Sequence, residues 1–305
     1  MIFFFFISGY LYEKNKEKYY QDCIEFCKKK TKQLIIPYLF WTLILYFAVN
    51  SVHLFFGQNI GGLLNNLGFP KTSIKEVVLN TVFFQDFYVE YLWYLYVLFL
   101  YFLSSIILRN IDKYIINKWF VLCCLVVVSY AVYINEMPYI LGKIVRYLPD
   151  YLIGRLLFHV FTSEKRGNHH RKNICFAIGG ILFAIAFFGR IRLMMPKTIL
   201  RASIVILVQD ALYWSIVILG IEISRFLDNN RIGKCLLLIG NYSFDIYLMH
   251  SPYIVPVVAM FLSKLHMNVI IVGIMSVSLG IIIPIVVSKY IIRKNMLLSR
   301  VMLGR

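Results

Sequence analysis

The sequence predicts an all-α protein, a polytopic helix bundle that spans a membrane. Of its 305 residues 60% are hydrophobic and only 15% are charged, and the mean hydropathy is +0.73. A soluble domain of this size has too little interior to hide so much apolar surface. The lysines and arginines, which give a formal charge of +17, gather in short runs between apolar segments. Such runs are typical of the cytoplasmic loops of membrane proteins rather than of a nucleic-acid-binding face.

Eight apolar segments come close to the roughly 20 residues that a membrane-spanning helix needs. They are residues 34–56, 91–108, 119–134, 144–161, 174–188, 199–221, 236–262 and 269–291. The opening stretch MIFFFFISGYLY is too short to cross a bilayer and predicts a partial span before them. We therefore expect about eight full spans plus a partial first one, all within a single domain of residues 1–305.

The basic residues also predict an orientation. Most of the lysines and arginines fall in alternate loops, at residues 13–32, 109–118, 165–172, 225–234 and 289–305. The positive-inside rule places these loops and the C-terminus in the cytoplasm.

Two segments on the predicted extracytoplasmic side have unusual features. Residues 189–201 carry four cations, either as a statistical exception or as a surface for an anionic substrate. A helix is predicted at residues 73–84, either as a lid or as filler.

Residues 13–32 predict a helix that lies on the cytoplasmic surface, with aromatic residues on one side and lysines on the other. Its last lysines attract either anionic lipid or a polyphosphate, such as the nucleotide end of coenzyme A. Charge alone favours the lipid. These residues are Lys28, Lys29, Lys30 and Lys32.

Several ionisable residues fall inside predicted spans, where each costs on the order of 3 kcal/mol unless it faces a partner or a wet cavity. Arg146 and Asp150 lie four residues apart and can pair on one helix face. Lys143 and Arg155 lie within or beside the same helix, and Asp210, Asp245 and His250 lie in or near other spans. Each alone is more simply explained as structural, but together they predict a polar cavity within the bundle. Such a cavity serves either transport or intramembrane chemistry.

The stretch IGNYSFDIYLMHSPY at residues 239–253 resembles the late signature of the acyltransferase 3 family of integral membrane acyltransferases. Four further stretches are similar to family motifs in the same order, and the resemblance covers nearly the whole chain. They are FFFFISGYLY (3–12), KKKTKQLIIPYLFW (28–41), LWYLYVLFL (92–100) and YLPDYLIGRLL (147–157).

The resemblance implies a membrane O-acyltransferase of about ten spans, and the fucose 4-O-acetylase-like members look nearest. Such enzymes move an acyl group, commonly acetyl, from cytoplasmic acyl-CoA to a hydroxyl of a cell-surface or lipid-linked saccharide. Acyl-CoA would be the donor substrate, with no bound cofactor. The expected partners are the lipid bilayer, acyl-CoA and the saccharide acceptor, without nucleic acid, in the cell membrane. The six cysteines show no metal-ligand spacing, so no metal is expected.

The resemblance also suggests site residues. His250 matches the family's later histidine and is the candidate catalytic residue. It acts either chemically, as a base, or only through packing and hydrogen bonds, and the residues slightly favour a structural or substrate-positioning role. Lys28, Lys29, Lys30 and Lys32 are the candidates for binding acyl-CoA. The candidate substrate-binding residues are Ser8, Trp93, Arg146, Asp150 and Tyr247.

One departure from the family pattern leaves alternatives open. The family's proposed catalytic histidine lies in its first helix, and none of the six histidines here can take that place. Residues 1–5 fall in the middle of the family's second helix, so we expect the true start to lie upstream. An inactive fragment of the acyltransferase is therefore one alternative. A multi-span transporter or flippase for an anionic lipid-linked sugar is another, although no internal repeat supports it.

Overall fold

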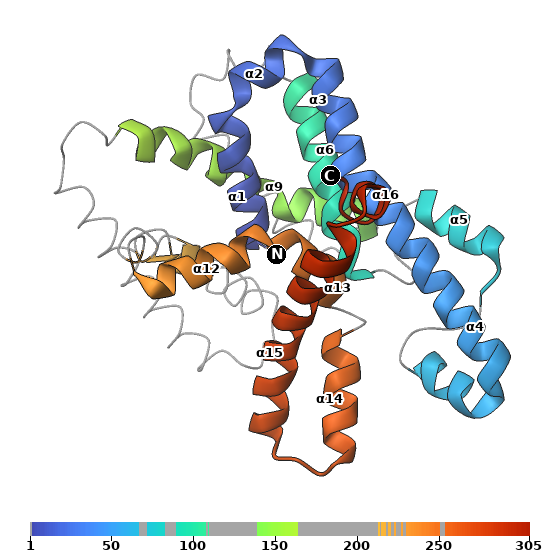
Figure 1. Ribbon diagram of the computed structural model, residues 1–305. Coiled ribbons are helices and arrows are strands. Elements are labelled where there is room, and N and C mark those ends of the chain that lie inside the picture. The colour runs from blue at the N-terminus through green and yellow to red at the C-terminus, as the bar shows by residue number, and fades with distance from the viewer. Residues whose placement is uncertain are drawn as a thin grey trace, which may run out of the picture. The chain divides into compact units, whose positions relative to one another are not determined.

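The computed structural model describes residues 2–66, 72–82, 90–107, 109, 139–163, 213, 215–217, 219–220, 223, 227, 230–250 and 254–305. Within these residues every regular element is a helix and no strand occurs, as the predicted fold class requires (Figure 1). The chain divides into two compact units. Unit 1 consists of Met1–Cys23 and Leu100–Lys234, and unit 2 of Ile24–Phe99 and Cys235–Arg305.

Among the residues that the structure describes, two stretches of helix are long and apolar enough to cross a membrane. They are Cys23–Phe55 and Val269–Ile292, and they contain the predicted spans 34–56 and 269–291 almost completely. Trp93–Ile107 and Val255–Lys264 are apolar but shorter helices. The predicted spans 119–134 and 174–188 and most of 199–221 lie outside the described residues.

Unit 1 is built on two helices that pack side by side, α1 (Ile2–Lys14) and α9 (Tyr139–Ser163). Their backbones touch at two glycines. A Cβ atom on Gly9 would overlap the carbonyl oxygen of Tyr151, and one on Gly154 would overlap that of Phe6. Small residues allow this kind of close approach between helices in membrane proteins.

Aromatic rings fill the space around this helix pair. The ring of Phe5 lies 5.4 Å from those of both Tyr101 and Tyr147, and Tyr101 lies 5.2 Å from Tyr151. Tyr101 belongs to α6 (Trp93–Ile107), whose second half is part of unit 1. The short helix α2 (Lys16–Gln21) follows α1.

Unit 2 contains the longest helix, α4 (Ile36–Asn66), which follows α3 (Cys23–Lys30) and the π-helical segment η1 (Thr31–Ile35) without a break in the helical path. The helices α14 (Val255–Lys264) and α15 (Val269–Val287) form an antiparallel hairpin (Figure 1). The π-helical segment η5 (Ser288–Ile292) continues α15, and α16 (Met296–Leu303) then packs against α4.

The helix predicted at residues 73–84 is confirmed as α5 (Ile74–Val82). Ser73 and Glu76 form a capping box at its start: the Glu76 amide donates to Ser73 Oγ at 3.3 Å, and the Ser73 amide donates to Glu76 Oε2 at 2.9 Å. This pattern satisfies two of the amide groups that a helix start leaves unpaired.

Two predicted helices are divided in the structure. Residues 236–262 do not form one continuous span, because α12 (Arg231–Asn241) ends before the turn at Tyr242 and α13 (Ser243–Met249) begins after it. Gly240 and Asn241, both poor helix formers, precede this turn. The surface helix predicted at 13–32 is likewise interrupted, at Asp22 between α2 and α3.

Candidate functional site

The predicted site residues fall in both units. Ser8, Arg146 and Asp150 belong to unit 1. The other members belong to unit 2: Lys28, Lys29, Lys30, Lys32, Trp93, Tyr247 and His250.

The histidine of the signature motif follows α13 and is held by the carbonyl groups of that helix. His250 Nδ1 lies 3.0 Å from the carbonyl oxygen of Ile246 and 2.8 Å from that of Tyr247. A carbonyl oxygen only accepts, so the hydrogen in these bonds belongs to Nδ1, an assignment made from the partners. In the neutral ring, Nε2 then carries the lone pair and can accept a proton. Nε2 has no hydrogen-bond partner among the described residues.

The segment that contains Trp93 meets the same helix. The buried Tyr247 donates a hydrogen bond from its hydroxyl to the Tyr91 carbonyl, and the Tyr91 hydroxyl approaches the Leu248 carbonyl at 3.4 Å. The Tyr94 ring packs edge-on against Tyr247 at 5.7 Å. Trp93, between Tyr91 and Tyr94 in the sequence, is also buried. The structure thus brings the beginning of α6 to the residues that precede His250.

The lysines predicted to bind acyl-CoA lie in α3 and η1, where the long helical stretch of α4 begins. Lys28, Lys29 and Lys32 are exposed. Lys30 is half-buried, with its ammonium group 5.6 Å from the centre of the Phe26 ring. The four lysines therefore present several positive charges on one short segment, and their role in donor binding stays a prediction.

In unit 1, α9 carries two of the predicted substrate-binding residues one turn apart. Asp150 is buried, and the Arg146 guanidinium lies 5.6 Å from the centre of the Tyr147 ring. Ser8 is half-buried on α1, the helix that packs against α9. The predicted pairing of Arg146 with Asp150, and their role with Ser8 in substrate binding, stay predictions.

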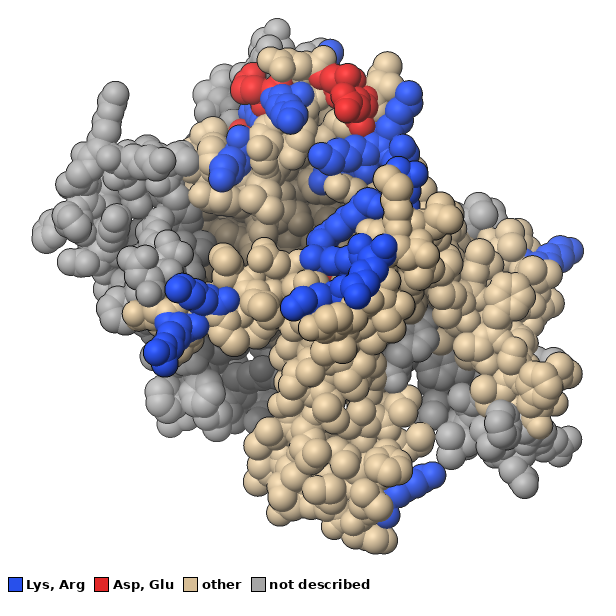
Figure 2. Space-filling model, in the orientation of Figure 1, with Lys and Arg blue, Asp and Glu red and all other residues tan. Residues whose placement is uncertain are grey.

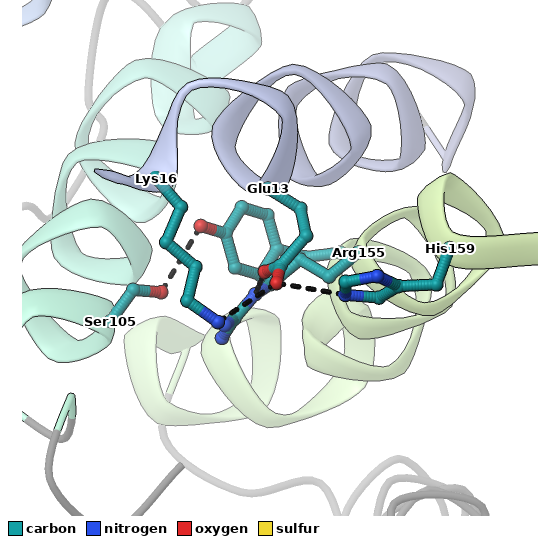
Figure 3. A network of polar contacts seen from close by, with 6 residues as sticks. Glu13, Lys16, Ser105, Arg155 and His159 are labelled. Carbon is teal, nitrogen blue, oxygen red and sulfur yellow. Dashed lines mark hydrogen bonds and ion pairs between the residues drawn. The ribbon is translucent and has the colours of Figure 1, made fainter. Parts of the chain in front are cut away.

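Unit 1 also holds an ionic network that the sequence did not predict (Figure 3). The carboxylate of Glu13, at the end of α1, is only 3% exposed. It accepts hydrogen bonds from Arg155 Nε at 2.8 Å and Lys16 Nζ at 2.9 Å, and His159 Nε2 lies 3.0 Å away. Figure 3 shows these three side chains converging on Glu13 from α9 and from the start of α2. The network ties the end of α1 to α9.

The positive groups keep Glu13 ionised. Burial alone would raise the pKa of this carboxyl group, because a charged group is costly away from water. Arg155 and Lys16 outweigh burial and lower the pKa below its ordinary value of 4.5. The sequence offered one signal for this network: Arg155 lies inside a predicted span, where an arginine needs a partner.

Unit 2 contains a second buried carboxylate, Asp245, in the middle of the signature motif. Its Oδ2 atom accepts hydrogen bonds from Ser288 Oγ at 2.5 Å and from the Nε and Nη2 atoms of Arg293 at 3.0 and 2.6 Å. Arg305 Nη2 lies 3.9 Å from Oδ1. The sequence predicted that Asp245 would need a partner in the membrane, but it did not indicate that the partners come from the C-terminal segment.

Comparisons with known proteins place the chain in a family. No curated protein and no solved structure matches it. A sequence model of the acyltransferase 3 family, described as an acyltransferase domain, matches residues 1–291. This match includes all five sequence motifs and both helical stretches that are long enough to cross a membrane, apart from the last residue of the second. The chain therefore belongs to the acyltransferase 3 family of membrane acyltransferases.

Proposed function

We propose that the protein is a membrane O-acyltransferase that moves an acyl group, acetyl in the simplest case, from acyl-CoA to a hydroxyl of a cell-surface or lipid-linked saccharide. Membership of the family supports acyl transfer in general. The single structural observation that carries the proposal is the orientation of His250, whose Nδ1 faces two carbonyl oxygens so that Nε2 is the atom able to take a proton.

The chemistry needs one proton acceptor. The acceptor hydroxyl oxygen attacks the thioester carbonyl carbon while its proton passes to His250 Nε2. The carbon–sulfur bond then breaks, the acyl group stays on the saccharide oxygen as an ester, and the coenzyme A thiolate takes the proton back from the imidazolium. Histidine suits this exchange because its ordinary pKa lies near neutral pH.

The residues around His250 support a fixed orientation of its imidazole ring. The hydrogen bond from Tyr247 to the Tyr91 carbonyl joins α13 to the segment that starts α6. The buried Trp93 and Tyr247, in the same unit as His250, are then the proposed contacts for the acceptor. Lys28, Lys29, Lys30 and Lys32 are proposed to attract the phosphates of the donor. Ser8, Arg146 and Asp150, in unit 1, stay predicted substrate-binding residues on the family resemblance alone.

The test is transfer of label from acetyl-CoA labelled in the acetyl group. Membranes that contain the full chain should place alkali-labile label, the signature of an ester, in the saccharide fraction. Replacing His250 by Ala should lower the rate about 100-fold or more, in line with the loss of a general base. His266→Asn, a histidine replacement in an exposed loop, is the matched control and should leave the rate unchanged. Equal rates for the two variants would remove His250 from the reaction.

A further inference from the structure

The C-terminal segment of unit 2 is fixed against the start of the long helical stretch. Gly304 adopts a left-handed conformation with φ 67°, and a Cβ atom there would overlap the Lys32 carbonyl oxygen. The Trp41 indole donates a hydrogen bond to the Met302 carbonyl at 3.2 Å, and Leu303 is buried. These contacts give Arg305, the next residue, a defined place beside η1.

The buried carboxylate of Asp245 orients Arg293 at this place and lies near a second arginine, Arg305. Arg293 forms a two-point contact with Asp245 Oδ2 and donates from Nη2 to the Asn241 carbonyl at 3.0 Å. Its guanidinium also lies 3.9 Å from the centre of the Tyr242 ring. Arg305 approaches the other carboxylate oxygen. The Asp245 side chain is 0% exposed, whereas those of Arg293 and Arg305 are 28% and 44% exposed. The carboxylate therefore lies beneath the two cations. It holds Arg293 by hydrogen bonds, whereas Arg305 is near enough for electrostatic attraction without a hydrogen bond.

The side-chain charges do not balance. Among the side chains, one carboxylate faces two guanidinium groups, and Lys32 follows in the neighbouring η1, so the basic side chains outnumber the acidic one. Among the described residues, Arg293 Nη1 donates no hydrogen bond to a protein acceptor. No guanidinium nitrogen of Arg305 lies within hydrogen-bond distance of a protein acceptor in the same set of residues. Figure 2 shows lysine and arginine gathered over this end of unit 2, around α3 and α16, while the lengths of α14 and α15 are almost free of them.

We propose that Arg293, anchored by Asp245, and the neighbouring Arg305 form a clamp that binds phosphate groups, with Lys32 as a third cation. Because Arg293 is already anchored through Nε and Nη2, it loses little freedom when Nη1 meets a phosphate. The planar fork of each guanidinium group matches phosphate oxygens in pairs. Both arginines follow residue 291, where the family match ends.

The clamp is a binding site for the phosphates of the acyl-CoA donor. This assignment of the ligand rests on the proposed function. Acyl-CoA carries its phosphates at the nucleotide end, and the clamp would hold them beside α13, the helix that leads to His250. Anionic lipid headgroups carry the same chemical group, so the experiment must separate the two sources of phosphate.

The experiment measures the dissociation constant of coenzyme A for the full chain in nanodiscs of phosphatidylcholine, with inorganic diphosphate as a competitor. Arg293→Lys keeps the charge but loses the planar fork, and Arg305→Gln removes the outer guanidinium. Each should raise the dissociation constant about tenfold or more, as expected for a lost charged hydrogen-bond contact. Arg300→Gln is the matched control. It also removes one positive charge, but at an exposed position of α16 outside the clamp. It should change the constant less than twofold.

Asp245→Asn distinguishes the clamp from simple attraction. Coulomb's law alone predicts tighter anion binding when a carboxylate is removed. The clamp predicts weaker binding, because Arg293 loses the group that orients it. Tighter binding by Asp245→Asn, an equal effect of Arg300→Gln and Arg305→Gln, or no binding of coenzyme A or lipid phosphate by the natural chain would each overturn the proposal. If Asp245→Asn does not give a folded protein, the comparison of Arg293→Lys and Arg305→Gln with Arg300→Gln decides.

Nanodiscs that contain phosphatidylglycerol separate the two sources. If phosphatidylglycerol leaves the dissociation constant of coenzyme A unchanged, the nucleotide is the occupant. If phosphatidylglycerol competes with coenzyme A in the natural chain but not in Arg305→Gln, the lipid headgroup is the occupant.

The clamp and the proposed function can also be overturned separately. Normal coenzyme A binding without acyl transfer would overturn the function alone. Transfer with the same KM for acetyl-CoA in Arg305→Gln and Arg300→Gln would overturn the clamp alone.

Discussion

Arg155 Nε lies 2.8 Å from the carboxylate of Glu13, a residue 142 positions earlier in the chain. The pair is buried, with side chains only 11% and 3% exposed. Lys16 and His159 surround the same carboxylate. This contact fastens the polar end of α1 to α9, the two helices whose backbones also touch at Gly9 and Gly154.

Loss of the Glu13 charge should destabilise unit 1. In Glu13→Gln the guanidinium of Arg155 stays buried without its counter-charge, which costs about 3 kcal/mol. Thermal unfolding of the purified chain in a neutral detergent measures the effect. Glu17→Gln removes an exposed acid four residues later and should leave the unfolding temperature nearly unchanged. Equal unfolding temperatures for the two variants would contradict a structural role of the buried pair.

The same pair should make stability depend on pH on the acid side. The pKa of Glu13 is lower in the folded chain than its ordinary value of 4.5. The stabilisation is therefore fully present above about pH 4.5 and is lost as the pH falls through the folded pKa. The difference in unfolding temperature between the natural chain and Glu13→Gln should shrink as the pH falls below about 4.5. A difference that grows in this range would show that the sign is wrong.

The contact between α1 and α9 should not tolerate a methyl group. Gly154→Ala places a Cβ atom against the Phe6 carbonyl, so the two backbones must separate. Overpacking of this kind typically costs about 1 to 3 kcal/mol. Gly273→Ala is the control, because no neighbouring atom lies within 4 Å of its Cβ position. Alanine should be neutral or slightly stabilising at Gly273, and unfolding temperatures compare the two variants.

The packing of α16 against the start of the long helical stretch should depend on Gly304. Gly304→Ala combines a positive φ with an overlap at the Lys32 carbonyl, so the C-terminal segment should detach more often. Limited trypsin digestion should then cleave after Arg293 or Lys294 several times faster than in the natural chain. Gly240→Ala, with open space around its Cβ position, is the control. Equal cleavage rates in both variants would indicate that the α16 contacts are not what protects these bonds.

The sequence predicted local features of the fold well. Hydropathy and length were enough for the apolar helices that contain residues 34–56 and 269–291, because each signal lies within one segment. The capping residues Ser73 and Glu76 mark the start of α5 in the same local way. The prediction of one continuous span at 236–262 was wrong. It gave more weight to the apolar composition than to the weak helix propensity of Gly240 and Asn241.

Partners across the fold could not be predicted in this way. Asp245 carries its own signal, an acid in an apolar segment, but the sequence does not say that Arg293 and Arg305 reach it. For the candidate site, motif resemblance singled out Trp93, Tyr247 and His250. The bond from Tyr247 to the Tyr91 carbonyl joins residues 156 apart, and only the packed helices bring them together.

The distance along the chain between Glu13 and Arg155 has a consequence for how the protein is made. A ribosome that adds about 5 to 20 residues per second needs roughly 7 to 28 seconds to pass from one to the other. Throughout that interval the carboxylate of Glu13 has been synthesised and Arg155 has not. During that time the Glu13 carboxylate lacks its Arg155 partner, so α1 can complete its packing against α9 only after α9 has been synthesised.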